Sequence, residues 1–278
     1  MVIVESAPWR IHSGAPAKLR KKIRAYIEEA AGRWCVNHAQ LVIVTQEEYR
    51  RTLLSQHPDR AHVIPASWLD EENILAEEEA AEAWRIKNSE NNRRLKLLFA
   101  GRLHPSKGVC VVLNAMRLLN RENALIDLHI LGTGELIGEC RAASKELTGV
   151  PRISVMGTVP YGPAFFRILG SYHAIVVPSF SDEQPRIVYD AFSQAVPVLA
   201  SATPGLLACV HDGQTGKIVD ENLPANWAAL FRWGFEHRDE LGRMGKEGLK
   251  TARGTTHRDM HEKRWRLLLQ MLGNTAAQ

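Results

Sequence analysis

The chain has 278 residues, 45% of them hydrophobic and 24% charged, which is enough for one large globular domain or two small ones. No run approaches the roughly 18 apolar residues of a membrane-spanning helix, and the N-terminal MVIVESAPWR lacks the pattern of a secretory signal peptide, so we expect a cytoplasmic protein. The formal net charge of +4 allows an anionic partner such as a phosphate-bearing ligand, an anionic membrane or a nucleic acid, without identifying one.

The first part of the chain reads as a partial N-terminal α/β domain, residues 1–69. Its strands and helices are expected at 2–5 (strand), 16–34 (helix), 41–45 (strand), 47 to about 55 (helix) and 62–68 (HVIPASW). Residues 70–94 are acidic, then Ala-rich, then polar. We interpret them as a connector that contains a helix, and as the main domain boundary.

The helix expected at 16–34 is both basic and apolar. Five of residues 18–24 are Lys or Arg. Its apolar positions recur on one face, at Leu19, Ile23, Tyr26, Ile27, Ala30 and Trp34. Three interpretations stay open: an ordinary domain helix with a solvated basic end, contact with an anionic membrane surface, or nucleic-acid binding. The last has no support from an aromatic-interleaved basic strand or a helix-turn-helix pattern, so we expect no nucleic-acid partner.

From Lys96 onward, strand and helix signals alternate. Strands are expected at 96–100, 125–131, 152–157, 174–178, 197–201 and 217–220, with helices at 108–120, 136–147, 164–172 and 186–194. Repeated βα units predict a doubly wound parallel sheet of the Rossmann-like kind, which we assign to residues 95–257, followed by a C-terminal helix over 258–278. In such sheets ligands bind beyond the carboxyl ends of the strands, so functional residues should directly follow strands.

Two turns after these strands suit an anionic ligand. GRLHPSKG, after the first strand, carries Arg102 and Lys107 near the start of a helix, where N–H groups and cations together bind anions. A solvated basic loop is the alternative. GTGE, after the second strand, contains Gly134 and permits close backbone approach, although a plain tight turn explains it equally well. Neither GxGxxG nor GxxxxGK[ST] is present.

The segment SFSDEQPRIVYDAF follows the fourth of these strands and carries two acids, Asp182 and Asp190. A carboxylate can accept two hydrogen bonds from neighbouring hydroxyls of a sugar or ribose. The alternative is that Asp182 caps a helix and Asp190 is a solvated acid. Four cysteines lack CxxC spacing and a His pattern, which predicts buried free thiols in a reducing compartment rather than a metal site; they are Cys35, Cys110, Cys140 and Cys209.

FAGRLHPSKG, GTGE, VPSFSDEQPRIVYDAFSQAVPVLAS and HDGQTGKIV occur in this order between about Lys96 and Val219. The set resembles the donor-binding domain of the retaining glycosyltransferases of family 4, also called glycosyl transferases group 1. The resemblance implies a GT-B-like α/β fold, with a doubly wound donor domain and a truncated N-terminal domain. It also implies transfer of a sugar from a nucleotide-diphosphate sugar, without a metal or a further cofactor.

The resemblance implies a role for each matching residue. Arg102 and Lys107 hold the diphosphate and stabilise the leaving group, and Asp182 lies near the transferred sugar. Asp190 binds the ribose hydroxyls, and the stretch at Thr158 and Val159 faces the base. The full set implied to bind the donor is Gly101, Arg102, Lys107, Gly134, Val159, Asp182, Gln184, Pro185, Arg186, Ile187, Asp190 and Gly205.

The chain departs from the family pattern in several places. Aspartates stand where the family has glutamates, Ala208 replaces an acid, and Ala195 replaces a glycine. Only about 95 residues precede KLLFA, which is shorter than a complete acceptor domain. His12 is a candidate acceptor-side residue, with an ordinary surface histidine as the alternative.

Two functional hypotheses lead. One is a glycosyltransferase of polysaccharide, glycolipid or glycoconjugate biosynthesis, cytoplasmic or peripheral at the inner membrane face. The other is a remnant that binds a nucleotide-sugar without catalysis, or that depends on a partner chain for the missing acceptor domain. A nucleotide-sugar epimerase with the same fold has less support, because the Arg102–Lys107 pair and the paired acids together favour transfer.

Overall fold

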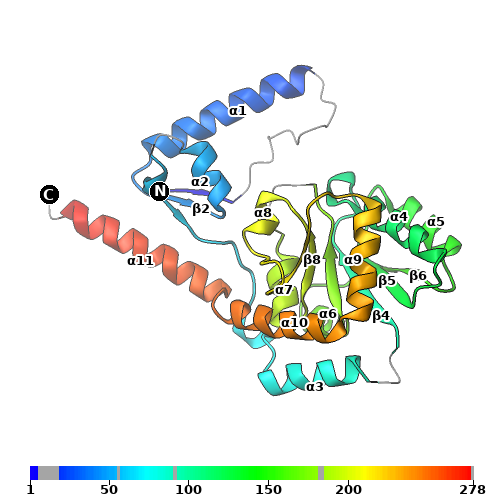
Figure 1. The fold of residues 1–278 in the computed structure, drawn as a ribbon. Coiled ribbons are helices and arrows are strands. Elements are labelled where there is room, and N and C mark those ends of the chain that lie inside the picture. Colours follow the sequence, from blue (N-terminus) through cyan, green and yellow to red (C-terminus); the bar gives the residue numbers. More distant parts are fainter. Residues whose placement is uncertain (6–18, 55–56, 90–92, 181–184, 277–278) are drawn as a thin grey trace.

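Two parallel sheets organise the chain in the computed structural model, which describes all residues except 6–18, 55–56, 90–92, 181–184 and 277–278 (Figure 1). The smaller sheet has the order β1-β2-β3, and the larger has the order β6-β5-β4-β7-β8-β9. The strands are β1 (Val2–Val4), β2 (Val42–Val44), β3 (Ala61–Val63), β4 (Leu95–Ala100), β5 (Ile126–Leu131), β6 (Arg152–Gly157), β7 (Ala174–Val177), β8 (Val198–Ser201) and β9 (Gly216–Val219).

The larger sheet confirms the predicted doubly wound arrangement. The chain runs outward from β4 through β5 to β6, then returns to place β7 beside β4 and continues to β9. The strands are apolar on both faces because helices cover both. In β4, for example, Leu97 and Phe99 enter one core and Leu98 the other. The sheet therefore has its topological switch point between β4 and β7, where folds of this kind open a crevice.

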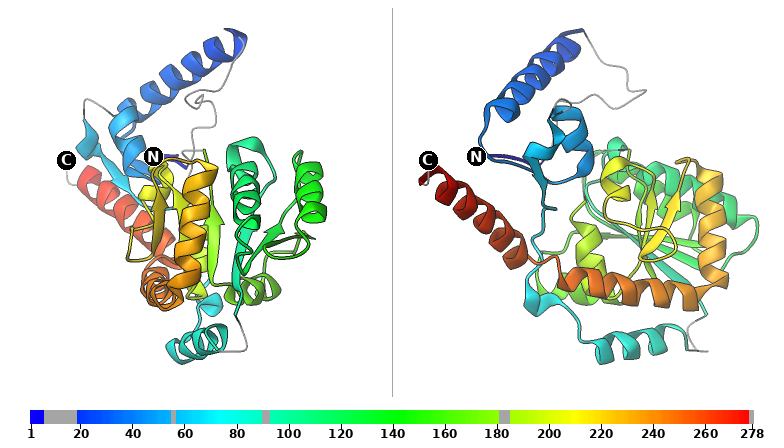
Figure 2. Two further views of the ribbon diagram at one scale, coloured as in Figure 1. Left: turned by 45° about the vertical axis from the view of Figure 1, so that its right-hand side comes forward. Right: turned by 60° about the vertical axis from the view of Figure 1, so that its left-hand side comes forward.

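Eleven α-helices occur in the described part of the chain. They are α1 (Leu19–His38), α2 (Glu47–Leu53), α3 (Glu77–Lys87), α4 (Val109–Asn120), α5 (Ile137–Glu146), α6 (Pro163–Gly170), α7 (Ile187–Ser193), α8 (Pro204–Leu207), α9 (Pro224–Glu236), α10 (Arg238–Arg253) and α11 (His257–Ala276). Helices α4, α5 and α9 pack on one face of the larger sheet, and α6 and α7 on the other (Figure 2). None of the described helices is both long enough and apolar enough to cross a lipid bilayer.

Helix α3, from the expected connector, packs against the larger sheet. The Trp84 indole N–H donates a 2.8 Å hydrogen bond to the Ala195 carbonyl, and its ring belongs to the core of that sheet. One turn on, the buried Lys87 ammonium donates to the Tyr172 carbonyl at 3.0 Å. The helix is thus fastened to the larger unit, while the division at 70–94 stays a prediction.

The smaller sheet lies between two helical layers. Helices α1 and α2 cover one face, through Val36, Tyr49 and Leu53. On the other face, α11 returns from the larger unit and places Met260 against Ile43. Figure 1 shows this unit on the side of α8, which follows strand β8 at its carboxyl end.

The structure corrects two expectations. Of the four cysteines, Cys140 and Cys209 are buried, but Cys35 is exposed and Cys110 is only partly buried, so the prediction of four buried thiols is wrong for these two. Cys35 lies on α1, a helix whose surroundings leave most of its surface exposed. The second correction concerns 62–68, where only residues up to Val63 continue the strand and the rest forms a linker.

Candidate functional site

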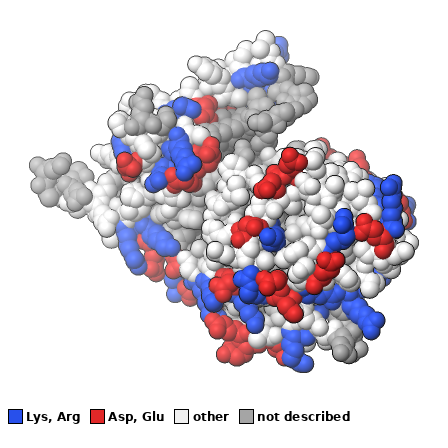
Figure 3. Space-filling model, viewed as in Figure 1, with Lys and Arg blue, Asp and Glu red and all other residues white. Residues whose placement is uncertain are grey.

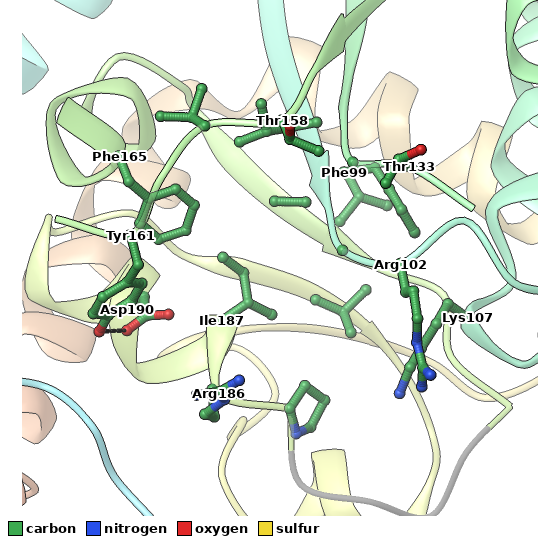
Figure 4. Close-up of a pocket in the computed structure, with 18 of the residues that line it drawn as sticks. Phe99, Arg102, Lys107, Thr133, Thr158, Tyr161, Phe165, Arg186, Ile187 and Asp190 are labelled. Carbon is green, nitrogen blue, oxygen red and sulfur yellow. Dashed lines mark hydrogen bonds between the residues drawn. The ribbon is translucent and has the colours of Figure 1, made fainter. Parts of the chain in front are cut away.

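A cavity of about 560 Å³ opens at the switch point between β4 and β7 (Figure 4). It lies beyond the carboxyl ends of these strands, as the fold predicts. Its walls come from segments that follow four strands of the larger sheet. They are residues 99–102, Lys107, 131–133, Thr158, Val159, Tyr161, Phe165, Val176, Val177, Ser179, 185–187 and Asp190.

One side of the cavity is cationic. Arg102 follows β4, and Lys107 ends a short 3₁₀ helix, Pro105–Lys107, that leads into α4. Figure 4 shows the two side chains next to each other, pointing the same way. Gly108 makes the junction possible because its φ of 70° is left-handed and a Cβ there would lie 1.7 Å from the Pro178 carbonyl oxygen. Two cations beside a helix N-terminus form a place for a multiply charged anion.

The loops after β4 and β7 are tied together at this side. The backbone N–H of Phe180 donates to the Ser106 carbonyl at 2.8 Å, and the Ser179 hydroxyl donates to the same carbonyl at 3.3 Å. The position of Lys107 is therefore coupled to the segment that precedes Asp182. Asp182 itself lies outside the described residues, together with Gln184 and His12.

The glycine turn after β5 supports the cationic side from behind. A Cβ on Gly132 would lie 1.9 Å from the Gly101 carbonyl oxygen, and one on Gly134 would lie 2.5 Å from that of Leu103. Gly132 and Thr133 line the cavity, whereas Gly134 does not. The structure shows a packing role for Gly134 against the loop after β4, and its place in the donor site stays a prediction.

The opposite side of the cavity is built around Asp190, on the first turn of α7. Only 6% of this residue is exposed, which contradicts the alternative of a solvated acid. The Tyr161 hydroxyl donates a 3.0 Å hydrogen bond to Asp190 Oδ1. Burial raises the pKa of the Asp190 carboxyl to about 7, although the Tyr161 hydrogen bond and the Arg186 charge act in the other direction. The carboxyl therefore changes its charge close to neutral pH.

Aromatic side chains close this side. The rings of Tyr161 and Phe165 have centroids 5.6 Å apart, and both rings line the cavity beside Thr158 and Val159. Arg186 places its guanidinium 4.6 Å from the ring centroid of Trp68, in the linker from the smaller sheet. The cavity thus offers flat apolar surface next to a carboxyl, and cations across from it. Such a lining suits a ligand with a planar ring, hydroxyls and phosphate groups.

Most of the predicted residues that the structure describes come together. Eight line the cavity: Gly101, Arg102, Lys107, Val159, Pro185, Arg186, Ile187 and Asp190. Gly205 is buried in α8 and, like Gly134, is not part of the lining, so its role in the site stays a prediction. Within the described residues, no group of three or more His, Cys, Asp or Glu could hold a metal ion.

Neither Tyr161 nor Phe165 is among the site residues predicted from the sequence. The signal was present, because both follow the third strand of the predicted sheet at the edge where the other site residues gather. Nothing in the sequence pairs Tyr161 with Asp190, which is 29 positions away.

A family model described as glycosyl transferases group 1 matches residues 94–233, about half of the chain. Among curated proteins, the chain is 29% identical over 167 residues to a D-inositol 3-phosphate glycosyltransferase of Arthrobacter sp. (strain FB24). It is 26% identical over 242 residues to the protein of that name from Corynebacterium glutamicum (strain R). These alignments cover 58% and 81% of this chain, but it spans only 39% and 57% of the two relatives.

Two solved structures share the fold. Sucrose-phosphate synthase of Thermosynechococcus elongatus matches with a TM-score of 0.76 and 18% identity, over 98% of this chain and 67% of that one. Anabaena HepE, in complex with UDP, matches with a TM-score of 0.72 and 13% identity, over 96% of this chain and 71% of that one. These likenesses confirm the predicted GT-B-like fold.

Proposed function

Because the chain belongs to the family of group 1 glycosyl transferases, we propose that its cavity binds a nucleotide-diphosphate sugar and that it transfers the sugar to an acceptor hydroxyl. The acceptor belongs to polysaccharide, glycolipid or glycoconjugate biosynthesis. The relatives are named for transfer to D-inositol 3-phosphate, and Anabaena HepE was solved with UDP. For the present chain, the donor is argued from its own cavity.

The observation that carries the proposal is the separation of charge within one cavity. Arg102 and Lys107 lie on one side, and the buried Asp190 lies on the other, beside Tyr161 and Phe165. A nucleotide-diphosphate sugar has the same order of chemistry: a planar base, a ribose with two hydroxyls, and a doubly charged diphosphate. The ionised Asp190 accepts hydrogen bonds from the ribose hydroxyls, and the aromatic side faces the base.

Catalysis is proposed to rest on the cationic side. As the bond from the sugar to the diphosphate breaks, negative charge grows on the leaving group. Arg102, Lys107 and the N-terminus of α4 lie together on this side of the cavity, where they can stabilise that charge. Two side-chain cations at this place support a mechanism without a divalent metal, and we propose retention of the anomeric configuration. Asp182 is assigned to the transferred sugar on the family pattern alone.

A panel of nucleotide-sugars tests the proposal. Calorimetry of the purified chain should detect at least one donor, and chromatography should detect release of the nucleoside diphosphate. The variants Lys107→Ala and Asp190→Ala should each weaken binding. Lys250→Ala, which removes an exposed cation paired with Glu247 on α10, is the matched control and should bind normally. Unchanged binding in the double variant of Lys107 and Asp190 would remove the site assignment.

A second candidate is a nucleotide-sugar-binding protein that transfers no sugar by itself or needs a partner chain. It is compatible with one observation: all eight predicted residues that line the cavity are assigned to the donor. The same assay separates the two, because donor binding without release of nucleoside diphosphate, with any acceptor tried, supports this second function.

A further inference from the structure

Helix α1 carries two different faces. Its less exposed face carries Ala25, Glu28, Glu29 and Gly32, together with Val36, which is buried in a cluster with Tyr49 and Leu53 of α2. A groove between this face and the edge strand β1 is lined by Gly32, Cys35 and Val36. Few contacts therefore hold the helix, and they lie toward its C-terminal half.

The larger apolar residues of α1 are on its outer face. They are between 52% and 78% exposed, and comprise Leu19, Ile23, Tyr26, Ile27 and Trp34. With about 100° of rotation per residue, these positions and Ala30 form one stripe about 100° wide. The stripe lies on the side away from Gly32 and Val36. Apolar periodicity in this helix thus marks a surface directed away from the protein core.

Cations border the stripe. On the same helical projection, Arg20 lies at one margin and Lys22 at the other; Arg24 lies further round beyond Arg20, and Lys21 lies on the opposite side of the helix. The first turn contains no acid. Arg24 pairs with Glu28 at 2.7 Å, one turn further along. Figure 3 shows Lys and Arg side chains (blue) among uncharged residues near the free end of α1, at the top of the view.

We propose that α1 docks on the surface of an anionic lipid bilayer, lying in the interface with its apolar stripe inserted. The arrangement of these side chains favours lipid over a protein partner. Cations on both margins of an apolar stripe reach anionic headgroups while their methylene stems cover the apolar surface. The stripe also carries Tyr26 and Trp34, residue types that prefer the headgroup level. In Figures 1 and 2 the N-terminal half of α1 projects away from the larger sheet and its helices.

Vesicle sedimentation with the full chain tests this proposal. The probes are vesicles of phosphatidylcholine alone and vesicles of phosphatidylcholine mixed with phosphatidylglycerol. The chain should sediment with the anionic vesicles, less so as salt rises, and should stay largely in solution with the neutral ones. An Arg20→Gln/Lys22→Gln double variant should bind the anionic vesicles about 30-fold more weakly, since each cation near such a surface contributes about fivefold.

Apolar variants provide the second arm. Ile23→Asn combined with Ile27→Asn should lower binding at least tenfold or so, because the insertion of the stripe is lost. Trp34→Ala should also weaken binding. The matched control is Trp265→Ala on α11, an aromatic residue that is 58% exposed and outside the stripe, and it should bind as the unmodified chain does. Circular dichroism and nucleotide-sugar binding should be the same in all variants, which excludes unfolding.

Several results would overturn the proposal. One is a chain that stays in solution with anionic vesicles at low salt. A second is equal loss of binding in the Trp34 and Trp265 variants. A third is a dimer in size-exclusion chromatography that the Ile23/Ile27 variant dissolves, because the stripe would then serve a second copy. The proposal does not rest on the proposed glycosyltransferase function, since vesicle binding without any donor binding would leave it standing while that function fails.

Discussion

The hydroxyl of Tyr161 donates a 3.0 Å hydrogen bond to Oδ1 of Asp190, and so joins the loop after β6 to the first turn of α7. The same hydroxyl lies 3.4 Å from the carbonyl oxygen of Trp68, in the linker from the smaller sheet. One phenol thus fixes the orientation of the only carboxyl among the described cavity-lining residues. Since burial raises the pKa of this carboxyl to about 7, its charge state should govern ligand binding near neutral pH.

Donor affinity should therefore depend on pH. The ionised carboxyl accepts hydrogen bonds from a ribose diol, and the protonated form loses part of this capacity. Between pH 6 and pH 8 the affinity for a nucleotide-sugar should rise by about tenfold, following the ionised fraction of a group with a pKa of about 7. Calorimetric titrations across this range measure it.

Asp190→Asn provides the control for that pH profile. It should bind more weakly and with little dependence on pH. The stability of the ligand-free protein should change with pH in the opposite direction to donor affinity. Because the pKa of Asp190 is raised in the folded state, the native protein retains a proton that the unfolded chain loses. The free energy of unfolding should therefore fall as the pH rises from about 4 to about 7. A steep binding profile in the asparagine variant would assign the titration to another group.

Lys87 predicts a stability change away from the site. Its ammonium is buried beside the Trp84 ring, 3.9 Å from the centroid, and burial lowers its pKa to about 7. Because the folded-state pKa is depressed, the unfolded chain binds more protons between about pH 7 and pH 10. The free energy of unfolding should therefore rise over that interval. Lys87→Met keeps the length of the side chain and removes the titration.

Denaturant unfolding at pH 7 and pH 9.5 measures the Lys87 effect. At pH 7 the free energy of unfolding of the methionine variant should exceed that of the unmodified protein by about 1–2 kcal/mol. The gain is not larger because the hydrogen bond to the Tyr172 carbonyl is lost. Lys250→Met, at an exposed position, should change nothing measurable. A strongly destabilised Lys87→Met protein would contradict the assignment of a costly buried charge.

The sequence predicts the parallel sheet well, because its strands are short apolar runs that end in glycine, proline or polar residues. All six predicted strands of the larger sheet are present, and so are the helices between them. The sequence does not predict whether the apolar face of a helix points toward the core or away from it. The recurrence of Ile23, Tyr26 and Ile27 shows that α1 has an apolar face, but periodicity has no information on what lies opposite it.

The sequence predicts those parts of the candidate site that lie in short local motifs, and not those that depend on contacts between distant segments. Arg102, Lys107 and Asp190 each follow a strand in a short motif, so their meeting at one edge follows from topology. For Gly134 the sequence alone does not separate packing from ligand approach, because both roles require the same residue in the same kind of turn. The pairing of Tyr161 with Asp190 depends on the relative positions of β6 and α7, which no local pattern encodes.

Gly108 should be the least replaceable residue of the cationic side. Gly108→Ala forces a Cβ to within 1.7 Å of the Pro178 carbonyl oxygen at a left-handed φ of 70°. Because backbone rather than a flexible side chain is the obstacle, the loop has to move. We expect a loss of about 2–4 kcal/mol in unfolding free energy together with weaker donor binding.

Gly138→Ala is the matched substitution for Gly108→Ala. It lies within α5, and a Cβ there meets nothing within 4 Å. Thermal denaturation should show no loss of stability, or a gain of up to about 1 kcal/mol from higher helix propensity. Equal melting temperatures for the two variants would mean that the loop after β4 yields more easily than its contacts with Pro178 suggest.

Asp190 and Tyr161 should be energetically coupled, and this coupling bears on why position 190 carries an aspartate where the family resemblance implies a glutamate. The longer side chain of Asp190→Glu would advance its carboxyl by about 1.5 Å, into the place of the Tyr161 hydroxyl. In the unmodified background this substitution should lower donor affinity by about tenfold, because a buried carboxylate is displaced from its hydrogen-bond donor.

With Tyr161→Ser, which frees the space of the ring, the same substitution should cost less or even restore binding. A double-mutant cycle on donor affinity should give a coupling energy of about 1 kcal/mol or more, as for other residues in direct contact. Tyr172→Phe is the control, since its hydroxyl pairs with His129 at 2.7 Å outside the cavity. Additive effects of the Asp190 and Tyr161 substitutions would show that the aspartate and the tyrosine act independently. The presence of an aspartate at position 190, rather than a glutamate, would then have another cause.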